Sequence, residues 1–267
     1  MNSELFDVRS VLFLPASNPR AIEKARAAGA DMVILDLEDS VRSEDKAFAR
    51  QAAVSGAAQD WPCLVAIRVN AVGSEWHRDD LKAVGRSLAD FVVLPRAVQP
   101  DDARSVAAAT GKPVLAMIET AAGVLASADI ATECAALIAG TNDLAADLRL
   151  PAGAGRGPMQ TALQTIVLAA RSRGVACFDG VFNRLEDLAG FAAEAAESRQ
   201  LGFDGKSLIH PNQVAPCHRA FAPAQAELDR AQRLIEAFGG GAGRFEGEMI
   251  ERMHVETARR LIARAGA

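Results

Sequence analysis

Eight short apolar runs recur along the chain and limit its possible folds more than any other feature of the sequence. Longer, alanine-rich stretches separate them, and their starts lie about 28 residues apart, the length of one strand–helix unit in a barrel. The runs are residues 10–16, 31–39, 63–70, 90–97, 113–120, 134–140, 176–182 and 205–210. Most are continuously apolar, as expected for parallel strands that are covered on both faces.

The number and even spacing of the runs favour an α/β fold, a (β/α)8 TIM barrel with a C-terminal helical extension. A doubly wound open sheet is the alternative, because neither number nor spacing determines the order of the strands. We expect the barrel to occupy residues 1–222. Residues 223–267 should form two further helices around a glycine-rich hinge at residues 239–243, and a flexible tail is the alternative for this segment.

The stretches between the runs carry residues that are typical of helix ends. Asn18 before Pro19 predicts an N-cap followed by a proline in the first turn, and Gly29 is expected to end that helix. Ser43 is expected to cap the next helix. The loop at residues 151–158 contains three glycines and is a candidate for a mobile lid.

Charge and cysteine content limit the class and the location of the protein. Lys and Arg total 29 against 34 Asp and Glu, a net charge of −5, which argues against a nucleic-acid or anionic-membrane partner. No apolar run approaches the roughly 20 residues of a membrane span, and no secretion signal is visible at the N-terminus. Cys63, Cys134, Cys177 and Cys217 are widely spaced, which indicates reduced thiols and a cytoplasmic protein.

Charged residues gather where the apolar runs end. They are Asp36, Glu38 and Asp39 in the second run, Arg68 in the third, Glu119 in the fifth, Asp143 after the sixth and Asp179 in the seventh. A charge at the end of an apolar strand is costly unless it is paired, bound to a ligand or facing a polar cavity. Because the active sites of parallel barrels lie at the carboxyl ends of the strands, we expect these residues to share one site.

Glu119 and Asp143 follow consecutive runs, so in a barrel they lie close enough to bind one hard cation. Oxygen ligands completed by water and substrate suit Mg²⁺, and a helix cap or a salt bridge is the alternative role of each acid. Arg68 offers a bidentate fork to a substrate carboxylate or a developing oxyanion. It can also pair with the neighbouring acids, and the two roles are compatible. Arg20 and Lys24 lie four residues apart on one helix face that would suit a phosphate group.

Five segments occur in an order that characterises one protein family. They are residues 9–15 (RSVLFLP), 29–41 (GADMVILDLEDSV), 67–70 (IRVN), 117–120 (MIET) and 205–213 (GKSLIHPNQ). Together they resemble the citrate lyase beta-subunit-like family, the acyl-CoA lyases of the aldolase/citrate lyase superfamily, which include malyl-CoA and citramalyl-CoA lyases. The likeness extends over essentially the whole chain.

The resemblance implies a (β/α)8 barrel that assembles as a homotrimer or a larger homo-oligomer. It implies Mg²⁺ bound by Glu119 and Asp143, with Arg68 as the catalytic residue that binds the small keto acid. The implied reaction splits or forms a 3-hydroxyacyl-CoA such as malyl-CoA or citramalyl-CoA, with acetyl-CoA and glyoxylate or pyruvate as the other partners. A malyl-CoA thioesterase and a citrate lyase beta subunit that acts on an acyl-carrier-protein thioester are the alternatives.

The resemblance also implies the residues that contact the coenzyme A thioester. Phe13, Arg20 and Lys24 match positions that contact coenzyme A, and Ile209 and His210 match a further substrate contact.

The C-terminal segment departs from the family pattern at one position. Lyases of the family carry an aspartate after a Gly-x-Met-[Ile/Val] stretch, and it reaches the site of an adjacent subunit as the acid/base. This chain has Glu251 there, within residues 247–251 (GEMIE). Glu251 keeps the carboxylate but is one methylene longer, and a misplacement of about 1 Å can lower a rate about 10²-fold.

Overall fold

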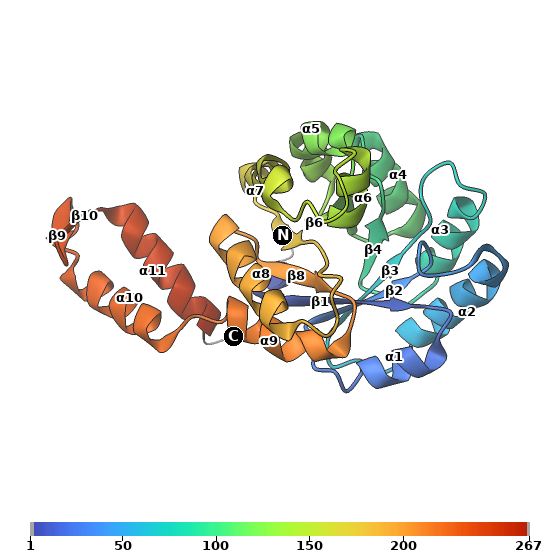
Figure 1. The fold of residues 1–267 in the computed structure, drawn as a ribbon, viewed down its shortest axis with the longest axis horizontal. Helices are drawn as coiled ribbons and strands as arrows, with labels where there is room; N and C mark the ends of the chain where they lie inside the picture. Colours follow the sequence, from blue (N-terminus) through green and yellow to red (C-terminus); the bar gives the residue numbers. More distant parts are fainter. Residues whose placement is uncertain (1–2, 266–267) are drawn as a thin grey trace. The chain divides into compact units, whose positions relative to one another are not determined.

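Eight parallel strands form a closed barrel in the computed structural model, which describes residues 3–265. The strands are β1 Ser10–Pro15, β2 Met32–Asp36, β3 Leu64–Arg68, β4 Phe91–Leu94, β5 Val114–Ile118, β6 Ala136–Ala139, β7 Ala176–Asp179 and β8 Gly205–Leu208. Each strand pairs with the next, and β8 pairs with β1 (Figure 1). The predicted (β/α)8 barrel is therefore confirmed, and the open sheet is excluded.

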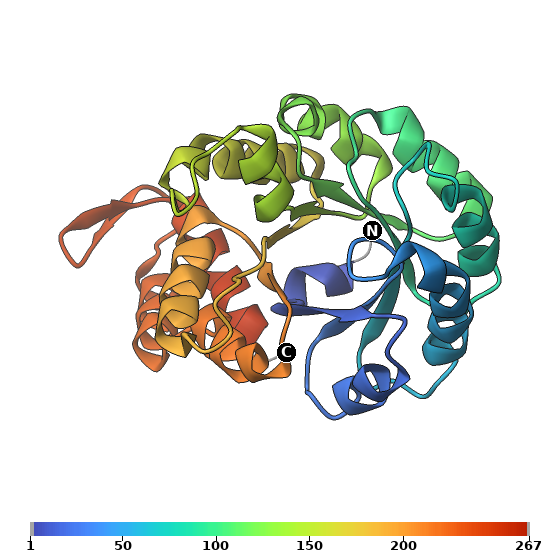
Figure 2. The ribbon, with the colours of Figure 1, turned by 45° about the vertical axis from the view of Figure 1, so that its right-hand side comes forward.

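Helices follow the strands and lie outside them (Figure 2). The α-helices are α1 Pro19–Ala25, α2 Lys46–Ala57, α3 His77–Gly85, α4 Pro100–Thr110, α5 Ala121–Ile130, α6 Thr141–Asp147, α7 Gln160–Arg173, α8 Leu188–Leu201 and α9 Val214–Phe221. The 3-10 helices are η1 Ser3–Asp7, η2 Ser43–Asp45, η3 Ala131–Glu133, η4 Gly157–Met159 and η5 Pro211–Gln213. No helix among residues 3–265 is long and apolar enough to cross a membrane.

The interior of the barrel is an apolar core built from alternate residues of the strands. Ile34, Ala66 and Met117 belong to this core, together with residues of every other strand except β8. Side chains two positions apart share one face of a strand, so Asp36, Arg68 and Glu119 face the same interior at its carboxyl end. The apolar pattern thus places these charged residues inside the mouth of the barrel.

The helix ends agree with the sequence only in part. The side chain of Asn18 accepts a hydrogen bond from the backbone N–H of Ala21 at 3.2 Å, so the predicted N-cap is confirmed. Helix α1 ends at Ala25, and Gly29 instead adopts φ +71° in the turn before β2. The predicted Ser43 cap is wrong, because a 3-10 turn occupies that position and α2 begins without a side-chain cap.

The described chain divides into two compact units, and residues 221–265 form the second of them. It contains α10 Gln225–Ala237, β9 Gly243–Phe245, β10 Glu248–Ile250 and α11 Arg252–Ala265. Its own core includes Leu234, Ile250 and Val255. The sequence predicted the two helices but not the hairpin. Glu246 and Gly247 both have positive φ, which is the backbone that a two-residue hairpin turn needs.

Candidate active site

A cavity of about 410 Å³ lies at the carboxyl ends of the barrel strands. Its lining includes Asp36 from β2, Arg68 from β3 and Glu119 after β5, together with Asp143 from the first turn of α6. The structure thus brings together, in one cavity, charged residues that are more than a hundred positions apart in the sequence.

Glu119 is buried at the side of this cavity and has close neighbours. Its Oε1 accepts a hydrogen bond from the backbone N–H of Arg96 at 2.6 Å. Burial, together with the nearby carboxylate of Asp143, raises the pKa of Glu119 to about 7. Asp143 is more exposed, and its Oδ1 lies 3.6 Å from Nη1 of Arg96. The two carboxylates therefore repel each other unless a cation lies between them.

This pair of carboxylates fits a magnesium ion. Both are hard oxygen donors, and because burial raises the pKa of Glu119, a bound cation would stabilise its charged form. Within residues 3–265, no group of three or more His, Cys, Asp or Glu side chains is arranged to hold a metal. Mg²⁺ is commonly held by one or two carboxylates and completed by water and substrate, so Glu119 and Asp143 would be sufficient.

Gly140 follows β6, and because it has no side chain, the side chain of Glu119 can occupy the space beside it. A Cβ at Gly140 would stand 2.4 Å from both Cβ and Oε2 of Glu119. We expect Gly140→Ala to displace the Glu119 carboxylate, to weaken Mg²⁺ binding about tenfold or more and to lower stability by about 1–3 kcal/mol. Calorimetric titration with Mg²⁺ and thermal unfolding would measure both effects.

Gly157→Ala is the matched control for this substitution, because nothing lies within 4 Å of the Cβ it would add. It should leave Mg²⁺ affinity unchanged. Equal Mg²⁺ affinity in Gly140→Ala and the unmodified protein would contradict the assignment of Glu119 as a ligand.

Arg68 and Asp36 form a buried bidentate ion pair. Nε of Arg68 lies 2.6 Å from Oδ1 of Asp36 and Nη2 lies 2.7 Å from Oδ2, and the parallel pairing of β2 with β3 places the two residues side by side. Burial alone would raise the pKa of Asp36, but the guanidinium of Arg68 holds it below the usual range. The centroid of the Phe13 ring lies 5.3 Å from the guanidinium carbon of Arg68. Arg68 is therefore held rigidly, with Nη1 turned to Glu38 at 3.0 Å.

The loop after β2 carries an excess of acid. Burial, together with the nearby carboxylates, raises the pKa of Glu38 to about 8. Lys46, at the start of α2, holds this loop: its Nζ donates to the carbonyls of Leu37 and Glu38 and to Oδ1 of Asn70, at 2.6–2.7 Å. Sequence reasoning missed Lys46. The signal that could have found it is a lone lysine in the first turn of a helix, directly after an acidic loop.

The five residues predicted to contact the thioester fall into two groups. Phe13 and Ile209 line the cavity. Arg20 and Lys24 are exposed on α1, and His210 accepts a hydrogen bond from the backbone of η5; none of these three lines the cavity. A role for Arg20 and Lys24 therefore requires a ligand that extends out of the cavity.

Asp179 does not belong to this site, so the expectation that it joins the other strand-end acids is wrong. Adjacent side chains of a strand point to opposite faces, and Phe178, its neighbour in β7, faces the barrel interior. The side chain of Asp179 therefore faces the helices. Its carboxylate is buried beside Lys206 Nζ at 2.7 Å and Arg156 Nη1 at 3.0 Å. Arg156 belongs to the loop at residues 151–158, and its ion pairs fix this part of the predicted lid to the barrel.

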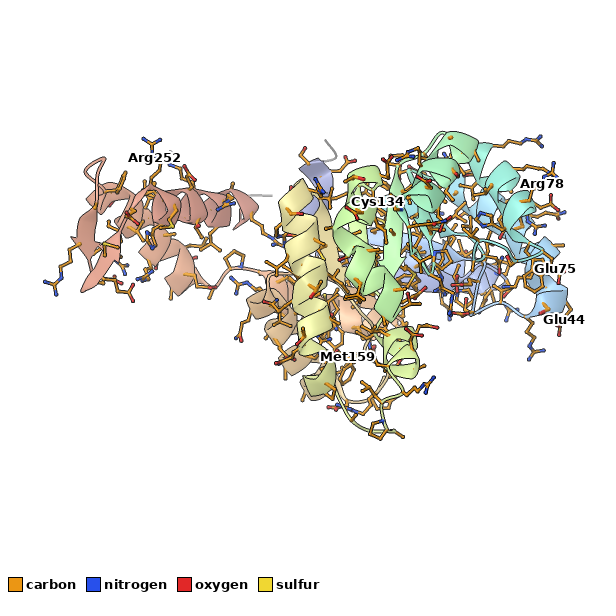
Figure 3. The ribbon with its side chains drawn as sticks, turned by 90° about the horizontal axis from the view of Figure 1, so that it is seen from above. Glu44, Glu75, Arg78, Cys134, Met159 and Arg252 are labelled. Atoms are coloured by element: carbon orange, nitrogen blue, oxygen red, sulfur yellow. The ribbon has the colours of Figure 1, made fainter. Side chains whose placement is uncertain are left out.

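The cysteines offer no nucleophile. All four are free thiols, and Cys134, which Figure 3 labels, lies ahead of β6. Burial raises the pKa of Cys63 to about 11 and that of Cys134 to about 12. Cys177 and Cys217 are fully buried, and burial also raises the pKa of each. The thiols therefore stay protonated near neutral pH.

Glu251 lies in the second unit, between β10 and α11. Its backbone N–H donates to Nδ1 of His254 at 2.9 Å, and its carbonyl accepts from the backbone N–H of His254 at 3.0 Å. The side chain is half-buried.

In a (β/α)8 barrel the carboxyl ends of the strands are where enzymes carry their active sites, and paired carboxylates there offer the oxygen ligands that a catalytic metal ion takes. Residues 9–211 match the HpcH/HpaI aldolase/citrate lyase family. The chain belongs to this family, as the sequence segments indicated.

Two similar proteins are named for different reactions, one for hydrolysis of a thioester and one for cleavage by a lyase. A (3S)-malyl-CoA thioesterase from Cereibacter sphaeroides is 39% identical, with 97% of this chain and 95% of the relative covered. The citrate lyase subunit beta of Escherichia coli is 35% identical, with 96% and 93% covered. The family therefore includes both a thioesterase and a lyase subunit.

Solved structures agree with the fold and identify ligands of the relatives. The protein CitE from Mycobacterium tuberculosis in complex with magnesium, acetoacetate and coenzyme A has a TM-score of 0.88 and 33% identity, with 97% of this chain and 98% of that chain covered. The citrate lyase beta subunit from the same organism, complexed with oxaloacetate and magnesium, has a TM-score of 0.75 and 33% identity, with 82% and 100% covered. Relatives in this family thus use Mg²⁺.

Proposed function

We propose that this protein is a Mg²⁺-dependent acyl-CoA lyase. It would cleave, or form, a short 3-hydroxyacyl-CoA such as malyl-CoA or citramalyl-CoA, with acetyl-CoA and glyoxylate or pyruvate as the products of cleavage. The observation that carries this proposal is the pair Glu119 and Asp143 beside the buried Arg68 in one cavity. Such a site suits a keto acid that chelates a metal ion and offers an anionic oxygen.

Bound through Glu119 and Asp143, Mg²⁺ would supply Lewis-acid polarisation of the keto-acid oxygen. Arg68 would stabilise the negative charge that develops on this oxygen, since Asp36 already holds its guanidinium in place and little reorganisation is needed. An acid/base must also move a proton to or from the terminal carbon of the acetyl thioester. The apolar side chains of Phe13 and Ile209 would limit access of water to this carbon.

The coenzyme A part of the substrate would extend from the cavity to the surface. Phe13 at the cavity would contact the thioester end, and Arg20 and Lys24 on the exposed face of α1 would bind the phosphates. This assignment agrees with the position of both cations outside the cavity.

We further propose that the chain forms a homotrimer or a larger homo-oligomer in which Glu251 of a neighbouring copy supplies the acid/base. Glu251→Gln is expected to lower kcat about 10²-fold or more, because the amide cannot exchange a proton, with Mg²⁺ affinity unchanged. Glu248→Gln, three residues earlier and in β10, is the matched control and should keep its activity. Turnover at the unmodified rate in Glu251→Gln would exclude the tail from the chemistry.

Two alternatives have specific support. The 39% identity to a (3S)-malyl-CoA thioesterase favours hydrolysis of the thioester after the same metal-assisted binding. The likeness to citrate lyase subunit beta favours a subunit that acts on an acyl-carrier-protein thioester.

One assay separates the three functions. The purified protein is incubated with malyl-CoA, with citramalyl-CoA and with the acyl-carrier-protein thioester, with Mg²⁺ or with EDTA, while keto acid and free thiol are measured separately. EDTA-sensitive glyoxylate or pyruvate without free thiol is the result expected for a lyase. Free thiol without keto acid would establish a thioesterase, and activity only on the carrier-protein thioester would establish the citrate lyase subunit.

A further inference from the structure

An irregular segment of the barrel forms one wall of the cavity. Residues 180–187, here called the strap, join β7 to α8 without forming a strand or helix. Val181 and Asn183 of the strap line the cavity. The side-chain amide of Asn183 also pairs with that of Asn142 on α6, from Nδ2 to Oδ1 at 2.7 Å.

Side chains that follow the strap in the sequence hold its backbone. Three of its carbonyl oxygens accept hydrogen bonds from β8 and η5: Gly180 from Lys206 at 2.7 Å, Phe182 from Gln213 at 3.0 Å and Leu185 from Asn212 at 3.2 Å. Backbone polar groups that are removed from water need such partners, and a segment without regular structure must obtain them from side chains. The position of the strap thus depends on β8 and the turn after it.

Gln213 differs from the other two donors because it also holds the cavity-lining segment that follows β8. It is fully buried, and its Oε1 accepts the backbone N–H of Ile209 at 3.0 Å while its Nε2 donates to Phe182. Ile209 also lines the cavity, directly after β8, which is the strand next to β7 in the barrel. One neutral amide therefore joins the segment that follows β7 to the segment that follows β8.

We propose that Gln213 is a positioning residue that sets the separation of Val181 and Ile209 in the cavity lining, and so determines which acyl group the site accepts. This inference rests on the proposed function. Malyl and citramalyl thioesters differ by one methyl group, and an apolar pocket discriminates one methyl group by about 10- to 200-fold. If Val181 or Ile209 moved by a fraction of the size of a methyl group, the site would lose most of that discrimination.

The test replaces Gln213 with methionine, which has a similar volume but cannot make either hydrogen bond. Gln164→Met is the matched control, because Gln164 also donates to a backbone carbonyl, that of Leu201 at 2.8 Å, on the outside of the barrel. We expect Gln213→Met to reduce the ratio of kcat/KM for the preferred over the other thioester about tenfold. Mg²⁺ affinity should change less than threefold, since the carboxylates belong to other elements. Gln164→Met should keep both the kcat/KM ratio and the Mg²⁺ affinity of the unmodified protein.

An unchanged kcat/KM ratio in a folded Gln213→Met variant would overturn the proposal, even if its Tm were lower, because lower stability alone does not alter discrimination. If Gln213→Met does not fold, Val181→Ala tests the same wall: it should reduce the ratio, and an unchanged ratio would again overturn the proposal.

A failure of the proposed function is distinguishable from a failure of this inference. If the unmodified protein turns over neither thioester, the comparison uses its affinities for pyruvate and glyoxylate in the presence of Mg²⁺, which also differ by one methyl group. A reduced affinity ratio in Gln213→Met would support the positioning role, and an equal ratio would overturn it.

Discussion

Glu119→Gln is expected to abolish turnover, with a loss of about 10³-fold or more in kcat, and to weaken Mg²⁺ binding about 10²-fold. The amide keeps the shape of the side chain but not the charge that a hard cation needs. Steady-state kinetics and calorimetric titration with Mg²⁺ would measure the two effects.

The same substitution should not destabilise the metal-free fold above neutral pH. Burial raises the pKa of Glu119 to about 7, so the ionised form is disfavoured in the folded state. The cost of burying the charge is absent well below the usual carboxyl pKa and is fully present above pH 7. Without metal at pH 8, Tm of Glu119→Gln is therefore expected to equal or exceed that of the unmodified protein.

Glu133→Gln provides the matched control, because Glu133 lies in η3, before β6, and pairs with Arg104 at the surface. It should retain Mg²⁺ affinity and activity. Full turnover or unchanged Mg²⁺ affinity in Glu119→Gln would remove the metal assignment.

Arg68→Lys is expected to lower kcat/KM about 10²- to 10³-fold, although the charge is conserved. A lysine ammonium cannot make the fork that Nε and Nη2 make to Asp36, so the charge would no longer be held at one place beside the keto acid. The loss of one hydrogen bond to the buried Asp36 should also lower the free energy of unfolding by about 1–3 kcal/mol. Kinetics and urea unfolding would separate the two effects.

Arg50→Lys is a control for the loss of stability alone. Nε of Arg50 lies 2.8 Å from the buried Asp80, outside the cavity. Arg50→Lys should lower the free energy of unfolding without changing KM or kcat. Wild-type kinetics in Arg68→Lys would contradict the proposed role of the arginine in binding the keto acid.

Local sequence signals predicted the barrel and much of the candidate site. Continuous apolar runs identify strands that are covered on both faces, and their spacing identifies the repeat. Charged residues at the ends of such runs are unusual enough to indicate a site, and Arg68 and Glu119 do line the cavity. The same reasoning failed for Asp179. In β7 both faces are apolar, so the sequence cannot tell which of them lies inside the barrel.

The sequence by itself determined the eight strands, the family and the types of residue that the cavity contains, because these depend on neighbours along the chain and on short motifs. Only the tertiary structure decided the direction of Asp179, the fit of Glu119 against Gly140 and the bridge that Gln213 makes between the segments after β7 and β8. The physical reason is that closure of the barrel and the register of its strands bring distant residues within contact distance. No local pattern encodes which of those residues then meet.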